Sequence, residues 1–241
     1  MRIPIITGLI KLRLLVNFRA DPAVVQRMLP SSFRPILHRG FALVGICLIR
    51  LERIRPAGWP GALGLSSENA AHRFAVEWTD ACGLQHEGVF IPRRDTSSLL
   101  NYVAGGRLFP GEHHPALFSV VDIGGRVELS MQSLDGSTTV RVLGQDAESL
   151  PATSCFRSLA EASAFFEGGS LGYSTTRGGH RLDGLRLHTL DWRVRPLAVT
   201  EVQSSYFADR QQFPNGSIDF DHALIMRDIV HEWRQEEDLH A

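Results

Sequence analysis

Two glycine-containing dipeptides near the middle of the chain constrain its fold more than any other feature. Gly124-Gly125 and Asp135-Gly136 each separate two segments rich in strand-forming residues. Such dipeptides tolerate the positive φ angles of tight β-turns, so both are hairpin signals. They predict three consecutive antiparallel strands, at residues 116–123, 127–133 and 138–143.

Strand-like segments also dominate the rest of the sequence. An amphipathic segment at residues 222–233 fits a helix and a strand equally well, and the sequence leaves both open. Residues 55–67 are rich in glycine and proline and are expected to form a loop. Further strands are predicted at residues 12–18, 41–51, 72–78, 88–91, 171–176, 185–190 and 198–207.

Three short helices are expected between these strands. Asp21 can cap a helix that has Pro22 at its first position, where the missing N–H has no partner to lose. Ser158 and Glu161 have the spacing of a capping box, which predicts a second helix directly after them. A third helix is expected at residues 97–104.

The order of these elements lacks the regular strand–helix alternation of a parallel α/β fold. It predicts an α+β chain, mainly β, in which a large antiparallel sheet or barrel carries helices on its outside. No repeat or linker divides the 241 residues, so a single domain over residues 1–241 is expected. A barrel of this kind can hold one small ligand in its mouth or interior.

Charge and cysteine content narrow the functional classes. The formal net charge is −1, with 25 basic and 26 acidic side chains, which argues against nucleic-acid and membrane-surface binding. The N-terminal apolar run is interrupted by Pro4 and Thr7 and lacks a cleavage site, so a cytoplasmic protein is expected. Cys47, Cys82 and Cys155 are odd in number and far apart, which predicts reduced, buried thiols that pack as small hydrophobic residues.

Two motifs resemble reactive or basic sites but have simpler interpretations. Gly168-Gly169-Ser170-Leu171-Gly172 matches the G-x-S-x-G pattern of hydrolases, which needs a strand before the serine and a helix after it. The predicted order here is the reverse, so we interpret the segment as a helix end followed by a turn. Basic pairs such as Arg93-Arg94 are interpreted as a solvated surface with packed aliphatic stems.

Glu112-His113-His114 is the densest cluster of titratable side chains. Pro110 and Pro115 flank it and favour a loop. Adjacent histidines point to opposite faces of a strand, and the cluster lacks the helical H-E-x-x-H spacing of a zinc site. It therefore predicts a polar or ligand-contacting loop, and we expect neither a metal nor any other cofactor.

A second polar group lies where the predicted loop enters the strand at residues 72–78. Glu68, Asn69 and Arg73 are spaced so that a carboxylate, an amide and a guanidinium could face one cavity. The spacing by itself favours the alternative, an ordinary surface pair.

Several segments resemble the acetoacetate decarboxylase superfamily. Residues 17–30 resemble its opening strand and helix, and residues 106–118 resemble its central G-R…P-K-K…P segment. Later segments are more similar to a bacterial sister family of unknown function that is allied to the decarboxylases. These later segments are residues 165–166, 172–174, 192 and 204–207. The resemblance as a whole extends over residues 12–233.

The resemblance implies a cone-shaped, closed or nearly closed antiparallel β barrel with flanking helices and an internal ligand cavity. The decarboxylase works through a Schiff-base lysine whose pKa a neighbouring lysine lowers. The positions of these paired lysines fall on Gly111 and Glu112, and the chain has a single lysine, Lys11. Imine chemistry is therefore not expected.

The resemblance also implies site residues. The family's loop carboxylate near the barrel mouth falls on Glu68, and the arginine of its G-R pair falls on Arg107. Arginine binds carboxylates through a charged two-pronged fork, and a buried glutamate can act as an acid or base. We expect acid–base roles for Glu68, Glu112 and His113, and ligand contacts from Arg107, Arg73, Asn69, His114 and Tyr173.

The expected function is the binding of a small organic compound with a carbonyl or carboxylate group in the internal cavity. If the protein is an enzyme, it is expected to be a cofactor-independent lyase, hydratase or isomerase without imine chemistry. A non-catalytic small-molecule binding protein is the alternative, and a structural subunit without a ligand is a third. The resemblance also implies homo-oligomerisation, which the composition itself does not indicate.

Overall fold

The computed structural model describes residues 4–80, 82–104, 111–176 and 181–240. The helices are α1 (Pro22–Gln26), the 3-10 turn η1 (Gly61–Leu63), α2 (Leu99–Ala104), α3 (Leu159–Gly168) and α4 (Ser205–Ala208). The strands are β1 (Ile6–Ala20), β2 (Arg34–Pro35), β3 (Leu37–His38), β4 (Phe41–Pro56), β5 (Leu65–Thr79), β6 (Gln85–Thr96), β7 (His113–Ile123), β8 (Arg126–Ser133), β9 (Thr139–Asp146), β10 (Leu171–Thr175), β11 (Arg181–Thr189), β12 (Arg195–Ser204) and β13 (Ile218–His240). In this part of the chain, no helix has the length and apolar character needed to cross a membrane.

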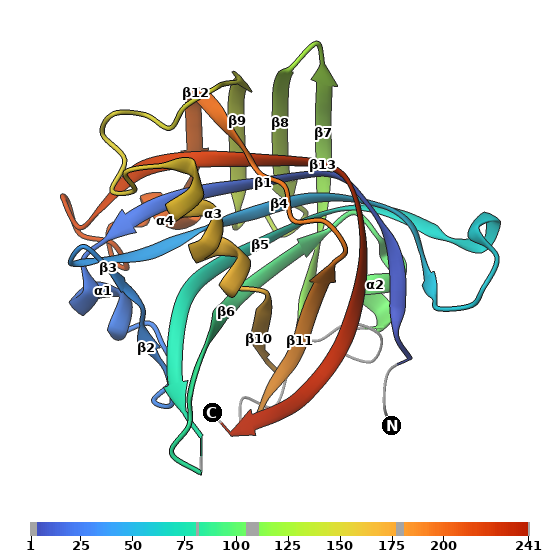
Figure 1. The fold of residues 1–241 in the computed structure, drawn as a ribbon, viewed down its shortest axis with the longest axis horizontal. Coiled ribbons are helices and arrows are strands. Elements are labelled where there is room, and N and C mark those ends of the chain that lie inside the picture. The colour runs from blue at the N-terminus through green and yellow to red at the C-terminus, as the bar shows by residue number, and fades with distance from the viewer. Residues whose placement is uncertain (1–3, 81, 105–110, 177–180, 241) are drawn as a thin grey trace.

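The strands form one continuous sheet that returns on itself. Its order is β11-β10-β6-β7-β8-β9-β12-β13-β1-β4-β5-β2, and β5 also pairs with β6 while β11 also pairs with β13. These two extra pairings connect β1, β4, β5, β6, β10, β11 and β13 into a closed circuit, which we call the seven-strand ring. Strands β7, β8, β9 and β12 form the second part of the sheet, which rises above the ring in Figure 1.

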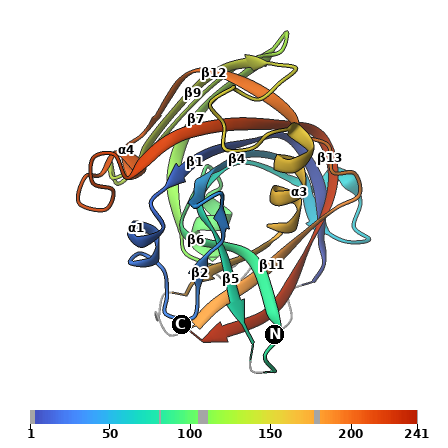
Figure 2. The ribbon, with the colours of Figure 1, turned by 60° about the vertical axis from the view of Figure 1, so that its left-hand side comes forward.

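Alternate side chains of the ring strands point to two different cores. On β1, Leu12 and Leu14 belong to the large core that includes residues of β8 and β9, whereas Leu15 belongs to a second core inside the ring. Helix α3 contributes Ala162 and Phe166 to this inner core. Figure 2 looks into the ring and shows α3 within its outline. The ring therefore has an interior that α3 occupies in part.

The predicted helix starts are confirmed by their caps. The Asp21 carboxylate accepts a hydrogen bond from the Ala23 amide at 2.7 Å, and Ser158 Oγ accepts one from the Glu161 amide at 3.1 Å. The Glu161 carboxylate does not complete the capping box at Ser158. It accepts instead from the Arg157 amide at 2.6 Å, one residue earlier. Ser158 therefore caps the helix as predicted. The prediction for the Glu161 carboxylate is wrong, because it binds the amide one residue before the expected one.

Three stretches differ from their sequence-based expectations. The undecided segment at residues 222–233 is part of strand β13. Its successive residues 223–226 are all buried, so its hydrophobic pattern has neither the period of a helix nor the alternation of a half-buried strand. The expected loop at residues 55–67 is shorter, because β4 continues to Pro56 and β5 begins at Leu65. The strand predicted over residues 198–207 ends at Ser204, whose hydroxyl caps α4.

Two fully buried histidines lie in the sheet without hydrogen-bond partners for either ring nitrogen among the described residues. His72 on β5 packs against the Tyr206 ring at 4.5 Å between centroids, and His231 on β13 packs against Trp233 at 4.4 Å. Burial lowers the pKa of His72 to about 3 and that of His231 to about 4. Both imidazoles are therefore neutral in the folded protein at physiological pH.

We expect His72→Phe to reduce the loss of stability on acidification. An unfolded chain protonates His72 near its ordinary pKa of 6.5, whereas the folded chain resists protonation down to about 3. The stability that depends on neutral His72 is complete above the ordinary pKa. As the pH decreases below that value, the free energy of unfolding decreases by up to about 1.4 kcal/mol per pH unit.

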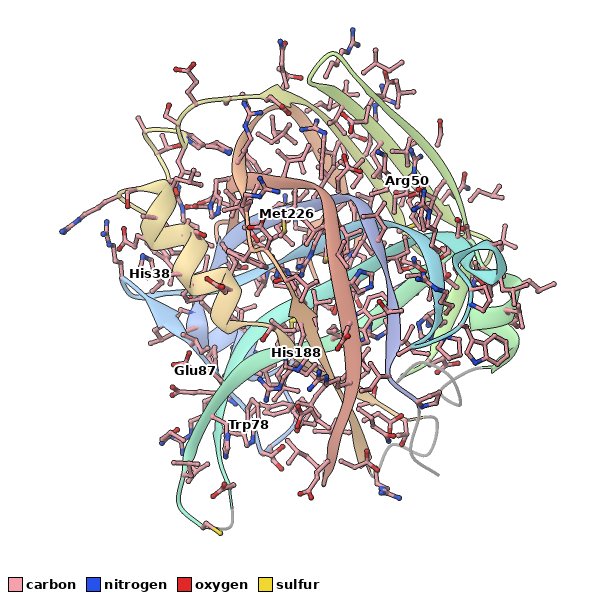
Figure 3. All side chains as sticks on the ribbon, turned by 45° about the vertical axis from the view of Figure 1, so that its right-hand side comes forward. His38, Arg50, Trp78, Glu87, His188 and Met226 are labelled. Carbon is pink, nitrogen blue, oxygen red and sulfur yellow. The ribbon has the colours of Figure 1, made fainter. Side chains whose placement is uncertain are left out.

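Chemical denaturation at two pH values measures this difference. Between about pH 8 and about pH 5, the unfolding free energy of the wild type should fall by roughly 2 kcal/mol more than that of His72→Phe. His188→Phe, at an exposed position labelled in Figure 3, is the control and should behave as the wild type does. Equal pH slopes for the wild type and His72→Phe would contradict the prediction.

Candidate functional site

A cavity of about 160 Å³ lies inside the seven-strand ring, next to the residues that follow α3. We call it the central cavity. Leu65 and Ser66 belong to its lining and are exposed, so the cavity reaches the surface at the start of β5. The apolar lining includes Ile49, Leu51, Ile54, Leu185, Leu187 and Trp233. The polar lining includes Arg13, Cys47, Asn69, Arg73, Arg94, Asp95 and His113.

Strand register brings the polar residues of the lining together. Cys47 on β4 pairs with Ala71 on β5, Ala71 pairs with Arg94 on β6, and Arg94 pairs with His113 on β7. These residues form one row across four strands, and the small side chain of Ala71 leaves space between Cys47 and Arg94. Arg73 is two residues along β5 from Ala71, where the pairing with β6 has a bulge. Residues two apart in a strand share a face, so Arg73 points into the ring together with Ala71.

Arg13 contacts the cavity from β1. It is 7% exposed, and its Nε donates a hydrogen bond to Cys47 Sγ at 3.2 Å. Its guanidinium lies over the Trp192 ring, 5.7 Å from the centroid. Its Nη1 is buried and has no hydrogen-bond partner within the described part of the chain. One end of this guanidinium therefore lacks an acceptor in the described chain, at a residue that lines the cavity.

Arg73 is held from behind. Its Nη2 donates to Asn17 Oδ1 at 2.7 Å, and its guanidinium lies 5.0 Å from the centroid of the Phe166 ring on α3. Burial lowers the pKa of Arg73 to about 10, so the guanidinium still carries its charge at neutral pH. Gly45 makes room for this contact, because a Cβ there would lie 2.4 Å from the Val16 carbonyl oxygen and 3.1 Å from Asn17 Oδ1.

A buried relay continues from Asn17 to β13. Asn17 Nδ2 can only donate, so His222 Nε2, 3.1 Å away, is the acceptor, and His222 Nδ1 donates to Asp221 Oδ2 at 2.5 Å. A bulge in the β1–β13 pairing lets the adjacent Asp221 and His222 meet. Although burial opposes it, hydrogen bonds from His222 and Ser154 lower the pKa of Asp221 to about 2. The relay keeps Asn17 Oδ1 directed at Arg73.

Arg94 completes a group of three cavity arginines. Its Nε donates to Ser174 Oγ at 3.0 Å, and burial lowers its pKa to about 10. Across the residues that the structure describes, no carboxylate lies within 4.0 Å of the guanidinium nitrogens of Arg13, Arg73 or Arg94. Three positive charges thus face one small cavity without an ion-pair partner.

Asp95 belongs to the lining, but strand register puts its carboxyl group on the other face of β6, with His114. Asp95 is fully buried and accepts hydrogen bonds from Arg93 Nε and Nη2 at 2.8–3.2 Å. Burial raises the pKa of Asp95 and outweighs the opposing effect of Arg93. The interpretation of Arg93-Arg94 as a solvated pair is wrong, because the Arg93 side chain is only 13% exposed and Arg94 lines the cavity.

The two adjacent histidines lie on opposite faces of the sheet. His113 lines the cavity with its Nδ1 3.2 Å from the Gly111 carbonyl oxygen, and burial together with Arg94 lowers its pKa to about 3. His114 points away, with its Nδ1 3.7 Å from Asp135. The expected loop is wrong here, because His113 begins β7 through its pairing with Arg94, while Glu112 is exposed just before it. No group of three or more His, Cys, Asp or Glu residues in the described ranges could hold a metal ion.

The group at Glu68, Asn69 and Arg73 is divided between two faces of β5. Asn69 and Arg73 line the central cavity, and Asn69 Oδ1 accepts a hydrogen bond from Thr96 Oγ1 at 2.7 Å. The Glu68 carboxylate accepts a hydrogen bond from Arg50 Nε and, among the described residues, is not part of the lining. Figure 3 shows Arg50 on the side of the molecule away from α3.

Tyr173 and Arg107 lie elsewhere. Tyr173 is 4% exposed and packs against Phe33 and Trp78, and its hydroxyl donates to the Glu237 carbonyl oxygen at 3.1 Å. Burial raises its pKa to about 12. In the part of the chain with described coordinates, the cavity lining includes its neighbour Gly172 and not Tyr173 itself. Arg107 lies outside the described residues.

Lys11, Ser170 and the three cysteines were also interpreted from the sequence. Lys11 is 46% exposed along its side chain, and its Nζ lies 2.7 Å from the Asp228 carboxylate, on the outside of the ring. Ser170 lines the cavity, with α3 before it and β10 after it, which is the reverse of the hydrolase order. Cys47 and Cys155 are buried as expected, but Cys82 is exposed in the turn after β5.

Sequence reasoning did not find Arg13, Cys47, Arg94 or Asp95. Arg13 carries the clearest signal, because it stands alone in the apolar run Leu12-Arg13-Leu14-Leu15. An arginine in a strand that is buried on both faces has a high desolvation cost, so it needs a specific partner. Arg94 carries no comparable signal, because its role depends on pairing with residues distant in the sequence.

Comparisons with known proteins identify the family and the fold of the chain. The family model described as an uncharacterized conserved protein, DUF2071, matches residues 11–226. No curated protein matches the chain. Several solved structures match over nearly the whole of both chains.

The matched structures share one fold at low sequence identity. An acetoacetate decarboxylase-like enzyme from Sphingomonas wittichii RW1 has a TM-score of 0.58 and 12% identity, and the match covers 100% of this chain and 94% of that one. Acetoacetate decarboxylase from Legionella pneumophila has a TM-score of 0.60 and 12% identity, with 98% and 88% covered. The enduracididine biosynthesis enzyme MppR complexed with pyruvate has a TM-score of 0.58 and 10% identity, with 100% and 91% covered.

The family match covers most of the chain, while the structural matches are too distant in sequence to show more than the fold. The mainly β architecture predicted from the sequence agrees with both. The chain belongs to the DUF2071 family of uncharacterized conserved proteins and has the acetoacetate decarboxylase-like fold.

Proposed function

We propose that this protein binds a small organic carboxylate in the central cavity, with the guanidiniums of Arg13, Arg73 and Arg94 as its anion contacts. The observation that carries the proposal is that these three cations face the cavity without a carboxylate within 4.0 Å in the described chain. Buried charge is costly unless it is paired, and a bound carboxylate supplies the missing partner. The guanidinium fork matches the two oxygens of a carboxylate.

The size of the cavity limits the ligand. A cavity of about 160 Å³ is close to one that holds a benzene molecule, so a ligand of about six non-hydrogen atoms fits. Leu51, Leu185, Leu187 and Trp233 offer an apolar surface for the hydrocarbon part of such a ligand. Short oxo acids combine these features, and the similar fold of MppR is known in complex with pyruvate.

The proposal excludes imine chemistry at the position that the resemblance indicates. Gly111 has a positive φ of 83°, and a Cβ there would lie 2.5 Å from Ser174 Cβ and 3.4 Å from Arg94 Nε. The space beside Gly111 is therefore occupied by Ser174 and Arg94. The amine of Lys11 is outside the ring and paired with Asp228. We propose that charge pairing to arginine replaces covalent attachment to lysine.

Whether the bound compound is transformed depends on groups near its carbonyl. His113 is neutral and lines the cavity, so it can accept a hydrogen bond there, although its lowered pKa makes it a weak base. Glu68 and Glu112, the carboxylates first expected to act as acid or base, would have to reach the cavity by a side-chain movement. The resemblance to the acetoacetate decarboxylase superfamily is the one reason to propose Arg107 as a fourth cation at the cavity. Recovery of the ligand unchanged after long incubation would favour a binding protein, and recovery of a product would favour an enzyme.

Carboxylate binding should depend on the cavity arginines. Arg73→Gln and Arg13→Gln should each weaken binding of pyruvate or acetoacetate by about ten- to a hundredfold, because a hydrogen bond to a charged group contributes about 1.5–3 kcal/mol. Calorimetric titration or ligand-induced thermal stabilisation measures the change. Lys11→Met also removes one positive charge but lies outside the cavity, so it should bind as the wild type does. Wild-type affinity in both arginine variants would refute the anion site.

The second prediction concerns the relay behind Arg73. Asn17→Asp is nearly isosteric and places a carboxylate 2.7 Å from Arg73 Nη2, where Asn17 Oδ1 now accepts. This internal partner should compete with the ligand and weaken carboxylate binding by about tenfold or more. Asn17→Ser, which adds no charge, is the matched comparison and should have a smaller effect. A larger loss in the serine variant would show that positioning, and not charge, dominates.

The third prediction concerns Lys11. Treatment with borohydride and acetoacetate should leave the intact mass of the protein unchanged, because an imine needs an unprotonated amine next to the bound carbonyl. The hydrogen bond and charge of Asp228 raise the pKa of Lys11, which disfavours that form further. A reduced adduct mapped to Lys11 by peptide mass spectrometry would contradict the prediction.

A further inference from the structure

Cys47 lies in the middle of the cavity arginines. It is 9% exposed, and its Sγ accepts a hydrogen bond from Arg13 Nε at 3.2 Å. Arg94 lies in the same cross-strand row, and the charges of both Arg73 and Arg94 interact with this sulfur. A negative charge on Cys47 Sγ would therefore face three cations. Neighbouring cations are the usual surroundings of reactive cysteines.

A second observation, an unpartnered nitrogen of Arg13, points to a ligand beside the sulfur. Arg13 Nη1 belongs to the same guanidinium that donates to Cys47, yet it is buried without a hydrogen-bond partner among the residues described. A buried N–H of this kind needs an acceptor. Because Arg13 and Cys47 both line the central cavity, a carboxylate that satisfies Arg13 would bring the rest of its molecule close to the thiol.

We propose that Cys47 is the nucleophile of the central cavity and adds to the carbonyl carbon of a bound oxo acid. The proposal rests on the proposed carboxylate binding. In the addition a bond forms between Cys47 Sγ and the carbonyl carbon while the π bond of the carbonyl breaks. Its electron pair moves to the oxygen, which takes the proton lost by the thiol. The product is a hemithioketal, and no oxidant, reductant or further reactant is needed.

The other two cysteines provide internal standards for reactivity. Cys82 is exposed and samples the reactivity of a thiol at the protein surface. Cys155 is buried beside Asp221, and burial together with the Asp221 charge raises its pKa to about 12. One protein therefore contains a thiol among cations, a thiol at the surface and a thiol beside an anion. A single labelling experiment compares all three.

The experiment uses a pair of alkylating reagents of nearly equal size. Iodoacetate carries a carboxylate and iodoacetamide is neutral. Both form a bond between sulfur and the methylene carbon as iodide leaves with the electron pair of the carbon–iodine bond, and the thiol proton passes to solvent. Folded protein is treated with each reagent for short times, and labelling of every cysteine is quantified by peptide mass spectrometry. The ratio of the two rates at Cys82 corrects for the intrinsic difference between the reagents.

We expect the iodoacetate preference of Cys47 to exceed that of Cys82 by about tenfold or more, because clefts lined by one sign of charge concentrate counter-ions. Cys155 should remain unlabelled by both reagents. Arg73→Gln should reduce the preference at Cys47, whereas Lys11→Met should leave it unchanged. Pyruvate labelled with carbon-13 at its carbonyl should give an additional saturated-carbon resonance with the wild type that is absent with Cys47→Ser.

Two results would overturn the inference. The first is a Cys47 preference for iodoacetate no greater than that of Cys82, and the second is a pyruvate spectrum that Cys47→Ser leaves unchanged. Ligand-induced thermal stabilisation of Cys47→Ser separates this failure from a failure of the proposed function. If the variant and the wild type are both stabilised by pyruvate, carboxylate binding stands without the nucleophile. If neither is stabilised and Cys47 shows no preference, both proposals fail.

Discussion

The pairings of β5 with β6 and of β11 with β13 are the constraint on which the rest of the structure depends. They close the seven-strand ring, so every second side chain of its strands points into a limited space. Helix α3 fills part of that space with Ala162 and Phe166, and the remainder is the central cavity. A polar group that is buried on the inner face, such as Arg13 or Arg73, must find its partner inside the ring or in the cavity.

The polar groups on the inner face meet this requirement in different ways. Arg73 is held through Asn17 by a relay that ends at Asp221, and Arg94 donates to Ser174. Arg13 Nε donates a hydrogen bond to Cys47 Sγ, whereas Arg13 Nη1 has no hydrogen-bond partner among the described residues. The protein thus supplies acceptors for parts of its arginines, while no carboxylate of a described residue lies within 4.0 Å of their guanidinium nitrogens. In a fold shared with acetoacetate decarboxylase, the cationic character of the interior comes from guanidiniums and not from amines.

Local sequence signals predicted much of the fold. The hairpin dipeptides gave β7, β8 and β9 correctly, and Asp21 and Ser158 marked two helix starts, because these features depend on neighbouring residues only. The site was harder to predict. Arg94 meets Ala71 and His113 only through strand pairing, and Arg73 meets Asn17 across Gly45 of β4, so both depend on register between distant segments. Tyr173 and Glu68 have polar groups that can bind a ligand, but both side chains lie on the face of their strand that does not line the cavity.

The single lysine has a practical consequence that is separate from catalysis. Lys11 holds the one ε-amine of the chain, and its side chain is about half exposed beside Asp228. A fluorophore or cross-linker directed at lysine side chains therefore attaches at one defined point on β1. That point is two residues from Arg13 in sequence but on the outer surface, while Arg13 faces the interior. The chain thus provides its own attachment site for a reporter close to the ligand cavity, without any engineered residue.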